Sequence, residues 1–281
     1  DPDSVLAEWR IHGAPLGILN QVTATGIFPT VAPAESTLDP LQDIASNPQG
    51  WTNYKSAEES PDTISEILET MVKEKWALTC KPWKEVTALV GSDQVTLSKL
   101  ALISKMKMDG SWKHRIIWDL LSSDVNSRVH QGERIILPRV LDVAQDVLDL
   151  CKLLRPGEDI YFFGTDVSDA FHQIPLRRNE WKFTVAEFAG KYYIFTVLVF
   201  GSASAPTVWG RYAAWLGRST STIIDPDRLR IQIYVDDPIY TIRGNLHDAA
   251  IEVAIALAWP MCCGYPLSWP KSEGGKRISW I

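Results

Sequence analysis

Residues 231–240, IQIYVDDPIY, decide the fold of this 281-residue chain. Apolar and polar residues alternate on both sides of two adjacent aspartates, which is typical of a β hairpin with acidic residues at its tip. Alternation places Ile231, Ile233 and Val235 on one face of the first strand and Asp236 on the other. The sequence therefore predicts a strand that is apolar on one face and acidic at the end of the other.

The adjacent carboxylates of Asp236 and Asp237 repel each other, and removal from water would strengthen that repulsion. The pair therefore needs either full solvation or a cation. A hard divalent ion such as Mg²⁺ prefers oxygen ligands and suits such a pair. A solvated turn is the simpler alternative, since Asp is a common turn residue. The choice between a turn and a metal site therefore depends on residues elsewhere in the chain.

Composition indicates a folded protein with a large core, in one or two domains. The chain is 46% hydrophobic and 22% charged, with twelve tryptophans, which excludes disorder. It has no apolar run long enough to span a bilayer and no secretory signal, and it does not begin with Met, so we expect an excised piece of an intracellular protein, cytoplasmic or nuclear. The cysteines lack metal-ligand spacing, and we expect all four to be reduced. They are Cys80, Cys151, Cys262 and Cys263.

The acidic residues are concentrated at the start of the chain. The net charge is −6, but residues 1–66 hold ten acidic and two basic residues, so the remainder carries +2. A charge of this size is compatible with binding to phosphates but is not evidence for it. Residues 1–60 are rich in Pro, Gly, Ser and Thr and predict an extension over the main domain, with a short helix at 4–11 and a role that the sequence does not reveal.

Residues 61–281 predict a mixed α and β domain. A helix should begin at Pro61, with Ser60 as its cap. The other expected elements are a hairpin of strands from residue 97 to 107 and from 112 to 118, a helix from Pro138 to about 156, strands at 160–166 and 191–200, a helix after the small-residue loop 201–206, a helix at 245–259 and a strand at 277–281.

The hairpin at 97–118 is basic. Its cationic residues are Lys105, Lys107, Lys113, His114 and Arg115. A solvated basic hairpin and a mobile flap that grips a polyphosphate both fit this pattern.

Asp166 ends the apolar strand 160–166, which is expected to be central and buried, so its carboxylate must be satisfied. Capping of the next turn is one explanation. An antiparallel sheet with helices on one face would instead bring Asp166 beside Asp236 and Asp237. Three converging carboxylates can hold two divalent ions, the arrangement used for in-line nucleotidyl transfer.

The ordered motifs resemble those of a reverse transcriptase from a retroelement. Residues 166–176 (DVSDAFHQIPL) are similar to the first palm motif of that family, and 200–206 (FGSASAP) to its template- and nucleotide-facing loop. Residues 234–237 (YVDD) are similar to its catalytic signature, and 107–119 (KMDGSWKHRIIWD) to the fingers hairpin. Lys271 and 279–281 resemble the last palm motifs, so the resemblance runs from about Ile64 to the end.

The resemblance implies an α+β fold: a right-handed polymerase palm, with a ferredoxin-like antiparallel sheet and helices on one face, plus interleaved fingers in 61–281. Thumb and RNase H regions are expected to be absent. The implied function is RNA-directed DNA synthesis from dNTPs at a primer 3′-hydroxyl, on an RNA or DNA template. Two ions, Mg²⁺ or Mn²⁺, are implied as cofactors, and no membrane partner.

Site roles follow from the same resemblance. Asp166, Asp236, Asp237 and Val167 would hold the metal ions. Lys107 and Arg115 would grip the triphosphate of the dNTP. The further implied nucleotide-binding residues are Asp169, Ala170, Phe171, Phe200, Gly201 and Lys271. Phe171 would exclude a 2′-hydroxyl, with an ordinary core Phe as the alternative. Lys271 would protonate pyrophosphate, with a solvated loop lysine as the alternative.

Three positions depart from the common pattern. Phe200 replaces the Gln of retroviral enzymes and points to gypsy-like or DIRS-like elements. Leu121 stands where Arg is common, and Pro238 removes a backbone donor beside the metal site. Two other hypotheses therefore stay open: a catalytically silent domain that binds nucleic acid or is only structural, and a polymerase that copies RNA into RNA, which Phe171 opposes.

Overall fold

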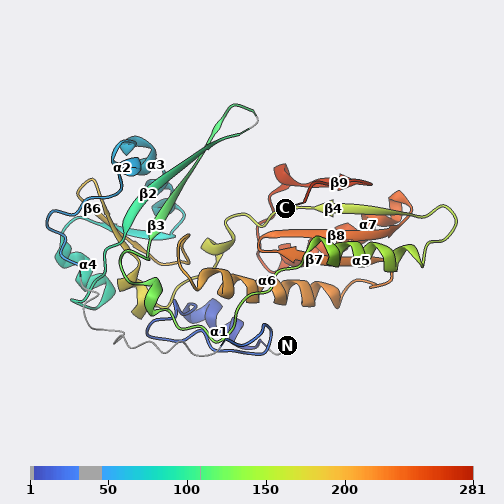
Figure 1. The fold of residues 1–281 in the computed structure, drawn as a ribbon, viewed down its shortest axis with the longest axis horizontal. Helices are drawn as coiled ribbons and strands as arrows, with labels where there is room; N and C mark the ends of the chain where they lie inside the picture. Colours follow the sequence, from blue (N-terminus) through green and yellow to red (C-terminus); the bar gives the residue numbers. More distant parts are fainter. Residues whose placement is uncertain (1–2, 32–45, 108, 281) are drawn as a thin grey trace.

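The computed structural model describes residues 3–31, 46–107 and 109–280, and it forms two lobes along the long axis of the molecule (Figure 1). The helices are α1 (Val5–His12), α2 (Lys55–Glu58), α3 (Pro61–Lys73), α4 (Trp83–Val90), α5 (Val140–Cys151), α6 (Ala205–Ser221) and α7 (Leu246–Cys262). The strands are β1 (Ala77–Cys80), β2 (Lys99–Met106), β3 (Trp112–Asp119), β4 (Asp159–Gly164), β5 (Val185–Phe188), β6 (Lys191–Phe195), β7 (Leu229–Tyr234), β8 (Asp237–Gly244) and β9 (Glu273–Gly275). Short 3₁₀ helices are η1 (Asn126–Arg128), η2 (Ala170–Gln173), η3 (Arg178–Phe183) and η4 (Trp269–Lys271).

The palm lobe is built on a four-stranded sheet in the order β7-β8-β4-β9, with every neighbouring pair antiparallel. Along the chain the elements of this lobe run β4, α6, β7, β8, α7, β9, with η2, η3, β5 and β6 inserted between β4 and α6 and η4 before β9. This alternation and strand order are those of a ferredoxin-like βαββαβ unit. The predicted α+β fold and the antiparallel ferredoxin-like sheet are therefore confirmed.

Both faces of this sheet are covered, because apolar and polar side chains alternate along β7. Ile231 packs with Tyr240 of β8 and with residues of α7 in one apolar cluster. On the opposite face, Gln232 donates to the Asp146 carboxylate of α5 at 2.8 Å, and Arg230 lies 3.8 Å from the same carboxylate. Figure 1 accordingly shows α5 and α7 on opposite sides of the strands. We expected helices on only one face of this sheet. That expectation was incomplete, because α5 packs on the opposite face through the polar side chains of β7.

The fingers lobe contains two smaller sheets, β1-β6-β5 and the isolated hairpin β2-β3. In the hairpin Lys105 pairs with Lys113 and Met106 with Trp112. Its outer end projects away from the lobe (Figure 1). The pairing of β2 with β3 alone leaves the hairpin's outer half exposed, whereas its base is buried at Leu100 and Trp118.

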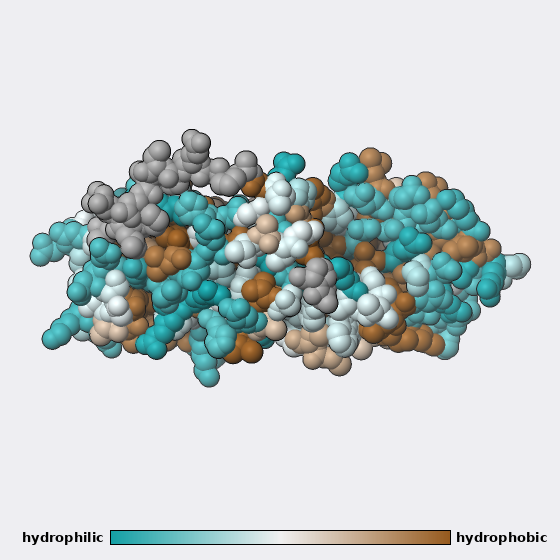
Figure 2. Space-filling view, turned by 90° about the horizontal axis from the view of Figure 1, so that it is seen from below, coloured by the Kyte–Doolittle hydropathy of each residue, from teal (hydrophilic) through white to brown (hydrophobic). Residues whose placement is uncertain are grey.

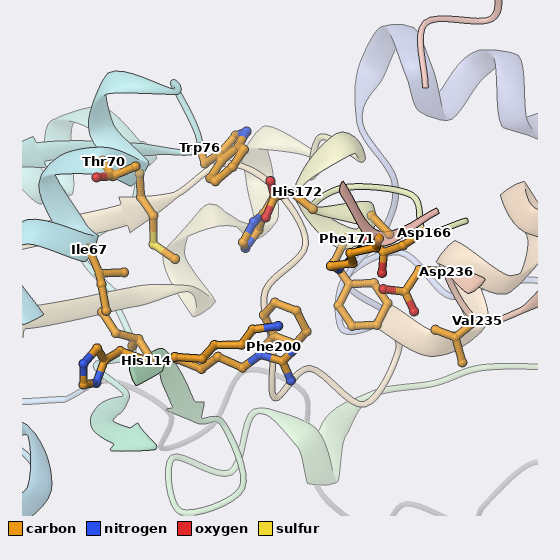
Figure 3. A pocket seen from close by; sticks show the side chains of 17 residues that line it. Ile67, Thr70, Trp76, His114, Asp166, Phe171, His172, Phe200, Val235 and Asp236 are labelled. Atoms are coloured by element: carbon orange, nitrogen blue, oxygen red, sulfur yellow. Dashed lines mark hydrogen bonds and ion pairs between the residues drawn. The ribbon is translucent and has the colours of Figure 1, made fainter. Parts of the chain in front are cut away.

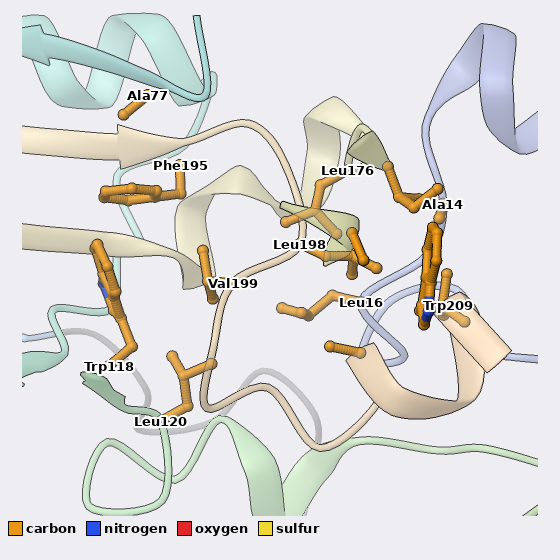
Figure 4. Close-up of a cluster of buried hydrophobic side chains, with 14 of the residues drawn as sticks. Ala14, Leu16, Ala77, Trp118, Leu120, Leu176, Phe195, Leu198, Val199 and Trp209 are labelled. Carbon is orange, nitrogen blue, oxygen red and sulfur yellow. The ribbon is translucent and has the colours of Figure 1, made fainter. Parts of the chain in front are cut away.

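The start of the chain is part of the core rather than a cover over it. Ala14 and Leu16 are fully buried beside Leu176 and Trp209, as Figure 4 shows. The buried Glu180 carboxylate accepts backbone N–H bonds from residues 16, 18 and 19 at 2.7–2.9 Å. The described part of 1–60 therefore packs into both lobes, and the boundary at residue 60 stays a prediction.

An ion pair fixes the start of the chain to α6. Asp3 and Arg211 are both buried and hydrogen-bonded to each other. The Arg211 guanidinium also lies 4.4 Å from the ring centre of Trp9 in α1. Breaking such a pair would leave an uncompensated charge in the core, which is strongly destabilising.

Most expected elements are present with shifted bounds. The helix at Pro61 begins there, but the Ser60 side chain makes no capping hydrogen bond. The strand expected at 191–200 ends at Phe195. The strand expected at 277–281 was wrong for residues 277–280, which form no strand, and Ile281 lies outside the described residues; β9 pairs with β4 at 273–275 instead.

The described surface is mixed in character. On the face shown in Figure 2, hydrophobic residues lie in separate patches between hydrophilic ones, which is ordinary for a folded protein. Within the described ranges, no helix combines the length and apolarity needed to cross a membrane. All four cysteines are free in the structure.

Candidate functional site

The acidic hairpin turns through Val235 and Asp236, and Asp237 is already the first residue of β8. The expected tip is thus displaced by one residue. Val235 has φ +55°, a left-handed conformation that is costly for a β-branched residue. The Trp209 indole N–H donates to the Val235 carbonyl at 2.7 Å. The surrounding packing therefore holds a turn that its own sequence disfavours.

Backbone hydrogen bonds bring Asp166 to this turn. Asp166 follows β4, the Val167 N–H donates to the Asp236 carbonyl at 2.8 Å, and the Thr165 N–H donates to the Pro238 carbonyl at 3.2 Å. Pro238 thus lacks a donor but still joins the two segments through its acceptor. The predicted convergence of the Asp166 strand end and the acidic hairpin is present.

The three carboxylates influence one another electrostatically. Burial, followed by the nearby Asp166 charge, raises the pKa of Asp236. Burial, followed by the neighbouring Asp236 charge, raises the pKa of Asp237 to about 6. Lys271 lies 2.6 Å from the Asp166 carboxylate and supplies a compensating positive charge. Among the described residues, no group of three or more His, Cys, Asp or Glu is arranged to hold a metal ion.

A pocket of about 410 Å³ opens beside Asp166 and Asp236 and reaches between the lobes (Figure 3). Its lining combines acidic, basic and aromatic side chains from the palm loops, β3 and α3. The lining residues are Ile67, Thr70, Met71, Trp76, Lys113, His114, Arg115, Ile116, Asp166, Asp169, Ala170, Phe171, His172, Phe200, Val235, Asp236 and Lys271. Acidic groups therefore lie at one end of the pocket, and cationic groups of the fingers face it from across.

The aromatic side of the pocket is formed by Phe171 and Phe200, whose ring centres are 5.1 Å apart. The Arg115 guanidinium lies 5.7 Å from the Phe200 ring centre. Burial, followed by the charge of Arg115, lowers the pKa of Lys113. Two cations of the same strand are thus close enough to repel each other, and an anion between them would relieve that repulsion.

The structure brings most of the expected site residues together. Those that line the pocket are Asp166, Asp169, Ala170, Phe171, Phe200, Arg115, Lys271 and Asp236. Asp237 and Val167 do not line the pocket, but each follows a lining residue in the chain. Lys107 is at the hairpin turn, where its carbonyl accepts from Gly110, and does not line the pocket.

Gly201 lies against a different groove, together with Tyr54 and Asn126. Its φ is +110°, and a Cβ there would lie 2.2 Å from the Trp118 carbonyl oxygen. Glycine is required at this position because the backbone of β3 passes too close for any side chain.

Nine lining residues were not among the expected site residues, and they include Lys113, Trp76 and His172. Lys113 precedes Arg115 by two residues and so shares its face of β3, a signal that the sequence contained. His172 was inside a recognised motif without a role. Trp76 follows α3, far from every motif, and no sequence signal indicated it.

Comparison with known proteins identifies the family. The family model described as "Reverse transcriptase (RNA-dependent DNA polymerase)" matches residues 103–280. Among curated proteins, no sequence matches the chain.

Solved structures of foamy virus proteins share the fold. A foamy viral protease-reverse transcriptase in complex with dsDNA is 16% identical, with a TM-score of 0.59, over 86% of this chain and 43% of that one. A dRH form in complex with ds DNA is 17% identical, with a TM-score of 0.56, over 83% of this chain and 34% of that one. The chain thus spans less than half the length of these proteins.

Proposed function

The chain belongs to the reverse transcriptase family, and we propose that it carries the nucleotidyl-transfer centre of an RNA-directed DNA polymerase from a gypsy-like or DIRS-like retroelement. The reaction would join a dNTP to a primer 3′-hydroxyl on an RNA or DNA template. One observation carries the proposal: the Asp166 segment is hydrogen-bonded to the Asp236 turn at the end of a pocket that Arg115 and Lys113 also line.

Asp166, Asp236 and Asp237 would hold two Mg²⁺ or Mn²⁺ ions, with Val167 contributing its backbone oxygen. The donor set fits these ions, because carboxylate and carbonyl oxygens are their preferred ligands. The raised pKa values of Asp236 and Asp237 support the same assignment, since burial and mutual repulsion disfavour uncompensated negative charge. When bound, such ions activate the attacking hydroxyl and stabilise the leaving pyrophosphate.

The remaining residues would bind and orient the nucleotide. Arg115 and Lys113, which line the pocket, would contact the triphosphate, and Lys107 would reach it from the hairpin turn. The backbone at Asp169 and Ala170 would approach the phosphates. Preorganised positive charge of this kind is the main contribution that a protein makes to phosphoryl-type transfer.

The aromatic pair Phe171 and Phe200 would hold the sugar, and the Phe171 ring would exclude a 2′-hydroxyl. Gly201 would let the loop after Phe200 pass close to the β3 backbone, because a Cβ there would lie 2.2 Å from the Trp118 carbonyl oxygen. Lys271, whose ammonium lies 2.6 Å from the Asp166 carboxylate, would hold Asp166 in place and donate a proton to the departing pyrophosphate.

Primer extension on an RNA template tests the proposal. The unaltered chain should incorporate dNTPs in preference to NTPs, and only with Mg²⁺ or Mn²⁺ present. Asp236→Asn should lower the rate by about 10³-fold. Asp109→Asn is a matched control, because Asp109 occupies the exposed turn of the basic hairpin, and it should change the rate less than about threefold. An Asp236→Asn variant as active as the parent would overturn the mechanism.

A catalytically silent domain that binds nucleic acid is the second candidate. It is favoured by the absence, among the described residues, of a ready three-residue metal group and by the exposed Leu121 in place of a cation. Titration of Mn²⁺ with and without dNTP separates the two candidates. Metal binding that strengthens with dNTP supports the polymerase, whereas no metal binding, or metal binding that dNTP does not strengthen, supports the silent domain.

A further inference from the structure

Trp209 is a fully buried side chain of α6 that contacts the acidic hairpin at its turn. Its indole N–H donates to the Val235 carbonyl at 2.7 Å. That carbonyl belongs to the peptide group that joins Val235 to Asp236. The nitrogen of an indole can only donate, so the bond fixes the direction in which this carbonyl points. The hydrogen bond therefore acts on the backbone directly before a candidate metal ligand.

The backbone of Asp236 is held on both sides of its Cα atom. On one side, Trp209 holds the Val235 carbonyl. On the other side, the Asp236 carbonyl accepts the Val167 N–H at 2.8 Å. The two peptide groups that flank a Cα atom determine the direction of its side chain, because the backbone has only two free dihedral angles per residue. Trp209 and the Asp166 segment together therefore aim the Asp236 carboxylate.

The turn needs this support because its own backbone is strained. Val235 has φ +55°, and this left-handed conformation is unfavourable for a β-branched residue. Strained conformations persist only where the surrounding structure holds them. A turn released from Trp209 would relax toward negative φ, and the peptide group next to Asp236 would rotate with it. The indole therefore does more than fill the core.

The ring of Trp209 also packs against the chain segment that holds Asp166. It meets Tyr265 edge-on, with ring centres 6.0 Å apart and planes at 69°, a favourable geometry for an aromatic pair. Tyr265 leads directly into residues 266–268, which two backbone hydrogen bonds of 2.8 and 2.9 Å join to residues 166–168. Trp209 therefore lies between the two segments that carry the candidate metal ligands.

We propose that Trp209 is a positioning residue of the carboxylate site, because it fixes the Asp236 turn relative to the Asp166 segment. This role rests on the proposed function. Residues that orient a metal ligand through a hydrogen bond typically contribute a factor of about 10–100 in metal affinity or activity. Phenylalanine would fill most of the same space but cannot donate, so the indole N–H is the group that matters.

Two substitutions of tryptophan by phenylalanine separate positioning from packing. Trp209→Phe removes the bond to the turn. Trp259→Phe is the matched control, because its indole N–H donates to the Ser219 hydroxyl at 2.9 Å, between α7 and α6. Each variant loses one indole hydrogen bond and the same atoms, so each should lower the melting temperature by about 2–4 °C. A merely structural role of Trp209 would end with that effect.

Metal binding and kinetics then distinguish the two variants. Mn²⁺ titration followed by electron paramagnetic resonance, without nucleotide or primer, should show an affinity about tenfold lower in Trp209→Phe and unchanged in Trp259→Phe. In primer extension, Trp209→Phe should lower kcat about tenfold and change the KM for dNTP less than about twofold, because the cationic side of the pocket is untouched. Hydrogen exchange of the metal-free chain should become faster at residues 235–237 in Trp209→Phe alone.

The outcomes separate the role of Trp209 from the function on which it rests. An unchanged Mn²⁺ affinity in Trp209→Phe, or an equal loss in Trp209→Phe and Trp259→Phe, overturns the role while primer extension by the parent upholds the function. If the parent neither binds Mn²⁺ nor extends a primer, the proposed function fails, and exchange at residues 235–237 still decides whether Trp209 holds the turn.

A second replacement keeps the test decisive if Trp209→Phe does not fold by its melting curve. Trp209 is then replaced by β-(3-benzothienyl)alanine, whose ring has the size of an indole but carries sulfur in place of the N–H. A tenfold loss of Mn²⁺ affinity in this protein supports the positioning role. The affinity of the parent in the same protein overturns it.

Discussion

The two β hairpins that contribute to the pocket turn through the same left-handed conformation with opposite kinds of residue. The basic hairpin β2-β3 uses Gly110, at φ +80°, with open space around it. The acidic hairpin β7-β8 uses Val235, at φ +55°, packed against the core and held by Trp209. One turn follows from its local sequence, and the other is imposed by its surroundings.

The two hairpins also differ in how firmly the rest of the fold holds them. The acidic hairpin lies in a four-stranded sheet and is hydrogen-bonded to the Asp166 segment, so its carboxylates have one arrangement. The basic hairpin is a two-stranded sheet of its own, with Lys105 and Lys107 exposed near its turn. Strained backbone that the fold over-determines is typical of functional sites. We infer that the acidic hairpin provides a fixed position and the basic hairpin an adaptable one.

The largest effect expected in this comparison is on the KM for dNTP, when one cation of the basic hairpin is removed. Arg115→Ala should raise the KM for dNTP by about 10–100-fold, because a charge-assisted contact to phosphate is lost, and Arg115→Lys should restore only part. Lys105→Ala, on the same hairpin but outside the pocket lining, is the control and should change KM less than about threefold. Lys107→Ala decides whether the hairpin turn reaches the triphosphate. Primer-extension kinetics measure all four variants, and an Arg115→Ala variant with the parent's KM would remove the basic hairpin from nucleotide binding.

Substitution of the left-handed turn residue in each hairpin tests whether the strained turn matters for activity. Val235→Gly should relieve roughly 1–3 kcal/mol of backbone strain, yet lower kcat about tenfold, because Asp236 becomes less fixed. Gly110→Ala should lower stability by about 1 kcal/mol and leave kcat unchanged. Urea unfolding and primer extension measure the two quantities. If Val235→Gly left kcat intact, the strained turn would have no catalytic purpose.

The smallest expected effect is the pH dependence of stability in the metal-free chain. The pKa of Asp237 is about 6 in the folded state, above its ordinary value near 4. Because the folded-state pKa is raised, its stabilising contribution is complete below pH 4 and is lost as the pH rises through 6. With chelator present, Asp237→Asn should therefore gain stability relative to the parent between pH 4 and pH 7, by about 1 kcal/mol, since Asp237 is only partly buried. A difference between the two proteins that does not vary with pH would contradict this origin.

Sequence patterns located the segments of the candidate site well, because each contains a strand with a clear pattern of residue types. The YVDD hairpin, the Asp166 strand end and the basic hairpin are all in place. Local patterns failed where the result depends on remote packing. The strand expected after residue 276 is not formed, α5 docks on the polar face of β7, and Leu16 of the supposed covering extension lies in the core.

By itself, the sequence determined the family, the α+β fold and the meeting of the Asp166 strand end with the acidic hairpin, since residue types and their periodicity are encoded locally. Only the tertiary structure decided which side chains share the pocket: Lys113 enters it, Lys107 stays at the turn, and Trp76, which follows α3, stacks on His172. Burial also set the electrostatics, because the raised pKa of Asp237 and the neutral state of His172 arise from surroundings that no local pattern contains.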